Sequence, residues 1–412
     1  MTELRICIVS FQYYRKNLRL LPWRYICEFS QQFLNLGHEV VIVTDGYPEF
    51  AKEDPIADVP AIHLTHVKHF PPRNFKNIAK AISEIDPDII LWQMGLTNLF
   101  QKRLFDTLNY PIVALIGSSI YWRSEIVRHL DAFEIYSERN FLTTSLAGNF
   151  IPRILTRSTL NSDAIKLVVV LSHETKSRLK NIGILPQKLV HLYPGVDTQF
   201  FQSSQYREIR NAKIDACEDT GKFLITYFGP PLLTRGIDTI LKAVEFAIER
   251  NPPLKYLLRV LFLFRIRQGE YSVEEKTVTK LFSRLHNKEV VKIKSGFLSS
   301  GEISAYLAAS DLIVLPFKHV ISDFPLGVTE AMSMGKLVIS TTIDGLPELL
   351  EERRGILIEP GDFENLARIF EHFSKNEFQL NEYGKRAKQY MLERPTWKES
   401  AEKMLELFRT FQ

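Results

Sequence analysis

The segment ISDFPLGVTEAMSMGKLVIS, residues 321–340, contains the pattern on which the fold assignment rests. A Pro-Leu-Gly turn opens a short helix of small and apolar residues, Gly335 ends this helix, and an apolar strand follows. The strand pattern DLIVLPF precedes the segment, at residues 311–317. A strand, a crossover helix and a second strand form the repeating unit of a parallel sheet. Glu330 is a candidate functional residue because it lies within a segment that otherwise has the character of protein core.

Strand and helix patterns alternate along almost the whole chain. Strands are predicted at RICIVS, EVVIVT, IHLTHV, DIILWQ, IVALIG, KLVVVLS and LVHLYP in the first half, and at FLITYFG, YLLRVLFLF, VVKIKSG, DLIVLPF, KLVIST and GILIEP in the second. Helical patterns between them include residues 23–36, 74–84 and 174–181. Short apolar runs separated by helices are typical of parallel sheets that are covered on both faces. The sequence therefore predicts an α/β protein.

A length of 412 residues exceeds that of one ordinary hydrophobic core, so we expect two doubly wound, Rossmann-like domains. The weakly periodic stretch FFQSSQYREIRNAKIDACEDTGK, residues 200–222, is interpreted as a linker. We place the first domain at residues 1–200 and the second at residues 201–388, facing each other across a cleft. In such sheets ligands bind at the carboxyl ends of the strands, so we expect the functional site in this cleft.

Composition and charge exclude several classes of protein. The hydrophobic share of 45% and the charged share of 24% are those of a globular protein. The net charge of +4 is not concentrated in either half, so no nucleic-acid partner is expected. Cys7, Cys27 and Cys217 lack metal-ligand spacing and are expected to be reduced. The N-terminus lacks a signal-peptide pattern and no apolar stretch is long enough to span a membrane, which predicts a cytoplasmic location.

The position of Glu330 suggests a specific chemistry. The free amides of Leu326, Gly327 and Val328, at the start of the helix, favour an anion such as phosphate. Glu330 lies one turn further along, and its carboxylate can accept two hydrogen bonds from a vicinal diol such as that of ribose. The alternative is an ordinary solvated helix glutamate, which the apolar neighbours of Glu330 disfavour. A nucleotide is therefore the expected ligand.

Six motifs occur in the order found in a known family. They are GHEVVIVT, VVVLSHETKSRLKNIGILPQKLVHLYPGVDTQFF, YFGPPLLTRGIDTILKA, YLAASDLIVLPF, SDFPLGVTEAMSMGKLVISTTIDGLPELLEERRGILIEPGD and PTWKESAEKMLELF. Over nearly its whole length the chain resembles the family 4 glycosyltransferases (glycosyl transferases group 1), which are retaining enzymes of the two-domain GT-B fold. The resemblance implies that a C-terminal helix, residues 389–412, crosses back to the first domain.

The resemblance also implies an activity. Family members transfer a sugar from a UDP- or GDP-linked donor to an acceptor hydroxyl, in the assembly of glycans, glycolipids or polysaccharides. The leaving phosphate oxygens help to deprotonate the acceptor, while the protein positions the reactants and stabilises charge. Neither a metal nor another cofactor is expected. The alternative interpretation is a catalytically silent GT-B protein that binds a ligand or a partner.

The family's catalytic and donor-binding residues map onto this sequence with losses. Glu330 corresponds to the second Glu of the family's Glu-x7-Glu pair, which holds the ribose, whereas the first Glu falls at Ser322. Either Ser322 or the adjacent Asp323 replaces its contact with the donor sugar, or the donor sugar is a different one. Of the two cations that bind the diphosphate, the first is lost at Pro230 and the second corresponds to Arg235. The expected catalytic residues are Glu330, Arg235 and Asp323.

The complete expected donor site follows from these motifs. It consists of Gly229, Arg235, Gly236, Phe297, Ser322, Asp323, Phe324, Pro325, Leu326, Gly327, Val328 and Glu330. Further departures from the family are Leu20 and Leu21 at its Gly-Gly loop, Ile116 at its histidine, and a missing Gly-x-Gly in LFLFRIRQGEY. These departures are the support for the silent alternative.

The acceptor site is less clearly marked. Tyr121, Trp122 and Arg123 follow a strand at its carboxyl end and are expected to contact the acceptor, although an ordinary helix-entry cluster explains them equally well. The stretch SLAGNFIPRILTRSTL joins Phe150, Ile151, Ile154 and Leu155 to Arg153 and Arg157. It suits a peripheral contact with anionic lipid, and its alternative role is packing against the domain core.

Two other motifs are set aside. Asp86 and Asp88 resemble the metal-binding Asp-x-Asp of other sugar transferases, but they precede the strand IILWQ and so lie at its amino end, away from the expected site. The stretches STLNSDA and RNFLTTS contain hydroxyls and acids without a histidine placed as a base, so a hydrolase triad has no support.

Overall fold

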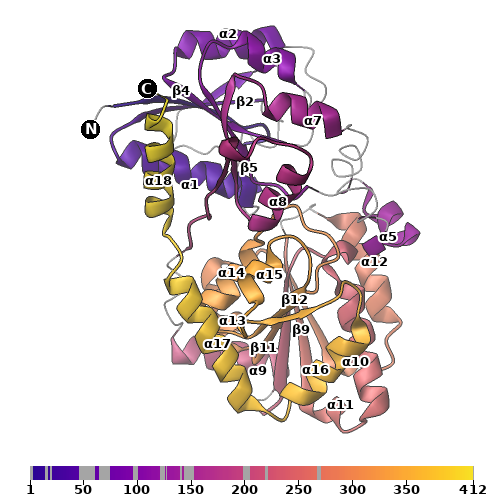
Figure 1. Ribbon diagram of the computed structural model, residues 1–412. Coiled ribbons are helices and arrows are strands. Elements are labelled where there is room, and N and C mark those ends of the chain that lie inside the picture. Colours follow the sequence, from indigo (N-terminus) through magenta and orange to yellow (C-terminus); the bar gives the residue numbers. More distant parts are fainter. Residues whose placement is uncertain are drawn as a thin grey trace.

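The structure is a computed structural model. It describes residues 3–13, 17–18, 21–45, 61–64, 75–95, 101–120, 126, 128–139, 142, 153–197, 205–218, 221–266 and 271–411. Two α/β domains follow each other along the chain, and the last helix returns to the first domain (Figure 1). The predicted two-domain α/β architecture is therefore confirmed. Among the described helices, none is long and apolar enough to cross a bilayer.

The first domain is built on a seven-stranded sheet in which all described pairs are parallel. Its strands are β1 (Arg5–Val9), β2 (Glu39–Asp45), β3 (Ala61–Leu64), β4 (Ile89–Gln93), β5 (Ile112–Ile116), β6 (Ile165–Val170) and β7 (Leu189–His191). The strand order is β3-β2-β1-β4-β5-β6-β7, so the direction of winding changes between β1 and β4. Central strands such as β5 are buried on both faces, which explains their continuous apolar sequence.

The second domain repeats this plan with six parallel strands. They are β8 (Phe223–Gly229), β9 (Leu258–Arg265), β10 (Val291–Gly296), β11 (Leu312–Val314), β12 (Val338–Thr341) and β13 (Ile356–Ile358). The order β10-β9-β8-β11-β12-β13 places the winding switch between β8 and β11. Ligands of doubly wound sheets bind beside this switch, at the carboxyl ends of the strands.

Helices connect the strands and cover the sheets. In the first domain they are α1 (Leu21–Asn35), α2 (Phe75–Ile85), α3 (Lys102–Thr107), α5 (Ala132–Ser137), α7 (Arg153–Leu160), α8 (His173–Asn181) and the 3-10 turn η4 (Pro186–Lys188). Those that follow are α9 (Tyr206–Cys217), η6 (Leu233–Arg235), α10 (Ile237–Arg250), α11 (Leu254–Leu257), α12 (Ser272–Ser283), η7 (Lys288–Val290), α13 (Ser300–Ala309), α14 (Leu326–Ser333), α15 (Leu346–Leu350), α16 (Phe363–Phe373), α17 (Glu377–Leu392) and α18 (Trp397–Arg409).

The stretch interpreted as a linker contains a helix, so that interpretation is wrong for most of its length. Gln205 and Glu208 form a capping box at the start of α9, and the helix packs against α13 and the second sheet. Its buried face consists of small residues, namely Ala212, Ala216 and Cys217. Small side chains give a weak hydrophobic period, which is why the sequence pattern missed the helix.

The C-terminal helix crosses between the domains as the resemblance implied. α17 contacts α14 of the second domain, whereas α18 packs on α1 of the first (Figure 1). The Trp397 ring lies edge-on to Tyr25 and Phe29, with centroid distances of 5.8 and 6.4 Å. Trp397 Nε1 also donates to Asp197 at 2.8 Å. A methyl group on Gly195 would lie 2.4 Å from the Trp397 backbone, so only glycine allows this approach.

We expect Gly195→Ala to weaken the attachment of α18. Because the added methyl group has no space, the cost should be about 1–3 kcal/mol of unfolding free energy, the range for overpacking. Gly301→Ala is the matched control, since a Cβ at this helical position meets nothing within 4 Å and alanine favours helix. Chemical denaturation measures both variants. Equal stability of the two variants would contradict the close packing of α18.

Candidate functional site

The loop between β8 and α10 forms one side of the second domain's switch point. Tyr227 Oη donates to the Pro230 carbonyl at 2.7 Å and so fixes the start of the loop. Gly236 has a φ of 77°, and a Cβ there would lie 2.0 Å from the Pro316 carbonyl oxygen. This position therefore requires glycine. The loop leads directly into α10, which begins at Ile237, as expected for a segment that binds an anion at a helix start.

Arg235 ends the η6 turn within this loop. Its guanidinium carbon lies 5.1 Å from the centre of the Phe317 ring, a cation–π distance. Its Nε is buried and has no hydrogen-bond partner among the described residues. A cation with an unpartnered buried donor at the carboxyl end of β8 suits an anionic ligand.

Acidic residues of the first domain contact the same loop, which the sequence did not indicate. The Leu233 and Thr234 amides donate to the Glu138 carboxylate, the second at 3.2 Å. Burial raises the pKa of Glu138 to about 7. Glu134, on α5, accepts a hydrogen bond from the buried Lys318. A carboxylate thus already uses two amides of the expected diphosphate loop.

The first turn of α14 forms the other side of the switch point. The Val328 amide donates to the Pro325 carbonyl at 2.9 Å, so the expectation that this amide is free is wrong. Leu326 and Gly327 supply the remaining free donors of the first turn. Gly327 packs tightly, since a Cβ there would lie 3.1 Å from the Phe228 ring. Two amides, rather than three, are available to an anion.

Glu330 lies on the half-buried side of α14 that faces the first domain. Its pKa is raised to about 7, mainly by burial and then by the nearby Asp197 carboxylate. Arg265 and Arg24 act in the opposite direction. Arg24 Nη2 donates to Asp197 at 3.3 Å. Glu330 is therefore a shielded carboxylate between two domains rather than a solvated helix residue.

Arg265 is the last residue of β9, the strand next to β8, and the sequence reasoning did not select it. Its Nε is buried and unpartnered within the described part of the chain. The signal that could have identified it is its place at the carboxyl end of a strand, where the family has a Gly-x-Gly.

Asp323 has a different environment from the one expected for a sugar contact. Its fully buried carboxylate accepts hydrogen bonds from three first-domain hydroxyls, those of Ser119 at 3.2 Å, Ser172 at 2.6 Å and Thr175 at 2.7 Å. Burial raises its pKa, although all three hydroxyls favour the charged form. In this arrangement Asp323 joins the loop before α14 to the first domain.

The other expected residues are dispersed. Ser322 is buried with its hydroxyl 3.4 Å from the Phe324 carbonyl, and the Phe324 ring packs 6.0 Å from that of Tyr193. Phe297 is 68% exposed after β10, beyond β9. Ile116 is buried at the end of β5. Six residues of the sequence analysis lie outside the described residues: Leu20, Tyr121, Trp122, Arg123, Phe150 and Ile151.

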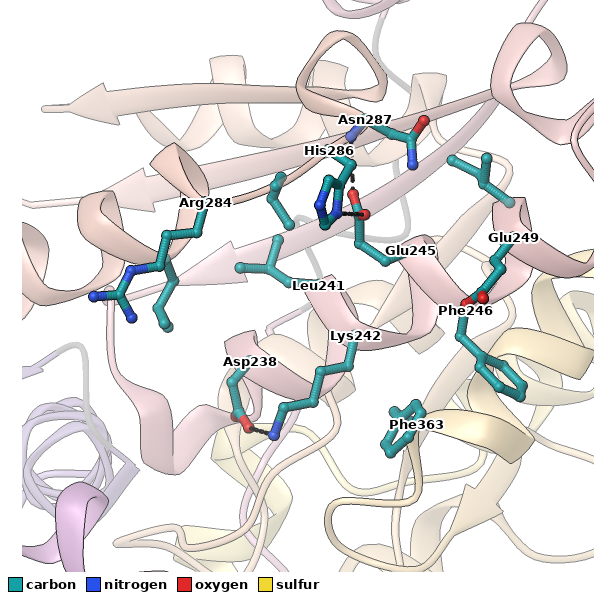
Figure 2. Close-up of a pocket in the computed structure, with 13 residues that line it drawn as sticks. Asp238, Leu241, Lys242, Glu245, Phe246, Glu249, Arg284, His286, Asn287 and Phe363 are labelled. Carbon is teal, nitrogen blue, oxygen red and sulfur yellow. Dashed lines mark hydrogen bonds and ion pairs between the residues drawn. The ribbon is translucent and has the colours of Figure 1, made fainter.

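A pocket of about 710 Å³ lies elsewhere, on the surface of the second domain (Figure 2). α10, the end of α12 and Phe363 line it. Two pairs of its polar side chains interact, since Lys242 lies 3.1 Å from Asp238 and His286 lies 3.1 Å from Glu245. None of the expected donor-site residues lines this pocket, so it is not the site derived from the motifs.

The chain is similar in sequence to known glycosyltransferases. The chain is 22% identical over 306 residues to the MMP alpha-(1->4)-mannosyltransferase of Mycolicibacterium hassiacum, covering 72% of this chain and 63% of that protein. It is 27% identical over 217 residues to the putative colanic acid biosynthesis glycosyltransferase WcaL of Salmonella typhimurium. This match covers 51% of this chain and 48% of that protein. The chain thus spans about half to somewhat under two thirds of these relatives.

Solved structures and family models cover more of the chain. The crystal structure of Anabaena HepE in complex with UDP-glucose is similar over 99% of this chain and 100% of that chain, with a TM-score of 0.74 and 15% identity. The model of Glycosyltransferase Family 4 matches residues 23–200, and that of Glycosyl transferases group 1 matches residues 210–390. Both domains are matched, in the expected order. The chain belongs to the group 1 glycosyltransferases and has the GT-B fold.

Proposed function

We propose that the chain is a retaining glycosyltransferase that moves a sugar from a UDP- or GDP-linked donor to an acceptor hydroxyl. We assign the product to the assembly of a glycan, a glycolipid or a polysaccharide. Support comes from the names of the relatives, one a mannosyltransferase and another assigned to colanic acid biosynthesis, and from the HepE complex with UDP-glucose.

The observation that carries this proposal is the meeting of three features at one switch point. Arg235 lies in the loop after β8, the free amides of Leu326 and Gly327 follow β11, and Glu330 lies one turn further along α14. β8 and β11 are neighbours in the sheet. A cation and amides suit a diphosphate, and a shielded carboxylate suits a ribose diol.

We propose the following division of roles. Glu330 accepts hydrogen bonds from the ribose, while Arg235 and the α14 amides stabilise the charge that develops on the departing diphosphate. A phosphate oxygen of the leaving group accepts the proton of the acceptor hydroxyl, so the reaction needs no nucleophile from the protein. Asp323 is a positioning residue in this scheme, because its carboxylate is engaged with three hydroxyls.

We further propose that Arg265 supplies the positive charge that is lost at Pro230. Arg265 lies at the carboxyl end of the strand beside the diphosphate loop, and its charge acts on Glu330. A buried guanidinium nitrogen without a partner among the described residues, such as Nε of Arg265, is costly, and a phosphate offsets this cost.

A panel of UDP- and GDP-linked sugars tests the activity. The purified chain is incubated with each sugar, and release of free UDP or GDP is followed with and without candidate acceptors. The enzyme hypothesis requires that one donor releases its nucleotide, faster when an acceptor is present. Binding of a nucleotide without any release supports the silent GT-B alternative instead.

Glu330→Gln tests the ribose contact. Loss of a charge-assisted hydrogen bond should weaken nucleoside binding about ten- to a hundredfold. With a pKa of about 7, the carboxylate ionises as the pH rises from 6 to 8, so the difference in affinity between wild type and variant should widen over this range. Calorimetry with uridine and guanosine at several pH values measures it, with the exposed Glu406→Gln as control.

The same raised pKa predicts that Glu330 stabilises the fold less as the pH rises. Because burial raises the pKa of Glu330 from 4.5 to about 7, its contribution to stability is fully present below about pH 4.5 and is lost as the pH rises through 7. Glu330→Gln should therefore melt no lower than wild type at pH 8. A variant that unfolds while its remaining folded fraction binds normally would make Glu330 a structural residue.

Arg235 should distinguish diphosphates from other ligands. Affinity for UDP or GDP should fall in the order wild type, Arg235→Lys, Arg235→Ala, because lysine replaces the charge but not the bidentate geometry. Nucleoside affinity should change little. Arg284→Ala, an exposed arginine of the Figure 2 pocket, is the control. Equal losses for nucleoside and diphosphate in calorimetry would remove Arg235 from the phosphate site.

We also propose that α7 contacts anionic lipid at the membrane surface. Ile154 and Leu155 are 72% and 44% exposed, beside the exposed Arg153 and Arg157, so these two apolar side chains do not pack into the core. Exposed apolar residues among cations suit a peripheral contact. Phe150 and Ile151, from the same motif, lie outside the described residues.

Vesicle flotation tests this contact. Wild type should float with anionic vesicles at low salt, and serine at both positions 154 and 155 should abolish flotation through loss of apolar burial. Tyr256→Ser removes an exposed ring from the second domain, 75% exposed, and should have no effect. Wild-type protein that stays at the bottom of the gradient contradicts the proposal.

A further inference from the structure

Two histidines and one glutamate converge between the domains, beside Asp323, whose charge acts on Glu348. His173 is the first residue of α8 and His191 the last residue of β7, both in the first domain, while Glu348 lies on α15 of the second. One potential ligand atom from each lies within 4.8 Å of the others. The two imidazole rings are 4.0 Å apart between centroids and tilted by 35°.

One hydrogen bond orients the His191 ring so that its other nitrogen can bind a metal. Its Nε2 lies 3.0 Å from the Leu171 carbonyl oxygen, to which a protonated Nε2 donates. The other ring nitrogen, Nδ1, then carries the lone pair. Metal-binding histidines commonly make this kind of contact, which fixes the tautomer and the direction of the ring.

One carboxylate oxygen of Glu348 has hydrogen-bond donors, and the other has none among the described residues. Its Oε1 accepts from the His173 and Glu174 amides, the second at 3.1 Å. Its Oε2 is buried and has no partner among the described residues. A buried carboxylate oxygen without a donor is unfavourable, and a cation beside it removes this cost.

Arg394, a nearby positive charge, does not fill this position. Arg394 and Lys176 are the cations that act on His191. The Arg394 guanidinium lies 3.3 Å from the centre of the Tyr193 ring, and its Nη1 donates to Tyr390 at 3.1 Å. Arg394 is thus directed onto the aromatic rings.

We propose that His173, His191 and Glu348 bind a divalent transition-metal ion, with zinc favoured by the donor set. Two imidazole nitrogens and one carboxylate oxygen form a common zinc coordination set, which leaves a fourth position for water. His173 is exposed, so that position opens to solvent. Neighbouring ligands at about 2.1 Å from a tetrahedral ion are about 3.4 Å apart, so the most distant pair of ligand atoms must close by up to about 1.4 Å.

The bound ion would couple the domains, because two ligands belong to the first domain and one to the second. Metal binding should favour the arrangement in which Glu348 caps α8. An ion that binds only this arrangement also raises the stability of the folded chain. None of the three residues belongs to the expected donor site, so the role proposed for the ion is structural.

Zinc titration of the chelator-treated full chain tests the proposal. We expect calorimetry to give one zinc per chain and the melting temperature to rise with zinc. When cobalt(II) replaces zinc, we expect the visible absorption bands of four-coordinate cobalt. His173→Ala should weaken zinc binding at least tenfold and remove the thermal shift. This variant keeps the backbone amide that binds Glu348 and changes an exposed side chain, so it should fold normally.

Two further variants make the result decisive. Glu348→Gln keeps an oxygen for the α8 amides but removes the charge, and should also weaken zinc binding tenfold or more. His286→Ala is the matched control. His286 is an exposed histidine on the second domain, 3.1 Å from the Glu245 carboxylate. Absence of stoichiometric zinc in wild type overturns the proposal. Equal zinc affinity of wild type and His173→Ala, or a loss confined to His286→Ala, overturns it as well.

Discussion

The buried carboxylate of Asp323 is the interaction on which the geometry of the cleft depends. Three hydroxyls of the first domain replace water around it, which is how a charge is accommodated in a protein interior. Asp323 lies between β11 and α14, so these bonds fix the loop that sets the direction of α14. The free amides of the first turn and Glu330, one turn later, are oriented by the same contact.

Carboxylates of the first domain lie close to the expected diphosphate loop of the second domain. Glu134 and Glu138 extend from the first domain to the loop and to Lys318 of the second. A nucleotide diphosphate brings further negative charge to the same loop, and like charges repel strongly where water is excluded. The raised pKa of Glu138, about 7, reduces this repulsion because part of the population is protonated at neutral pH. Arg235 and Arg265 provide the opposing positive charge.

The sequence predicted the architecture because local patterns encode it. Each predicted strand stretch overlaps a strand of the structure, and the continuous apolar runs predicted the parallel pairing. Glu330 was identifiable because a charge interrupts an apolar helix. α9 was missed since its buried side chains are alanines and a cysteine, which give little periodic signal.

Contacts between distant residues could not be read from such patterns. Asp323 is 151 residues from Ser172 and 204 from Ser119, and Glu138 meets the Leu233 amide across 95 residues. No spacing rule joins positions 173, 191 and 348 either. These pairings arise only when the two domains face each other, so they required the three-dimensional structure.

A crystal structure of the chain with bound UDP or GDP tests the central claim most directly. The account predicts ribose hydroxyls within hydrogen-bond distance of the Glu330 carboxylate and the diphosphate between Arg235 and the Leu326 and Gly327 amides. A nucleotide found in the α10 pocket of Figure 2, or one bound in the cleft without contact to Glu330, would contradict it.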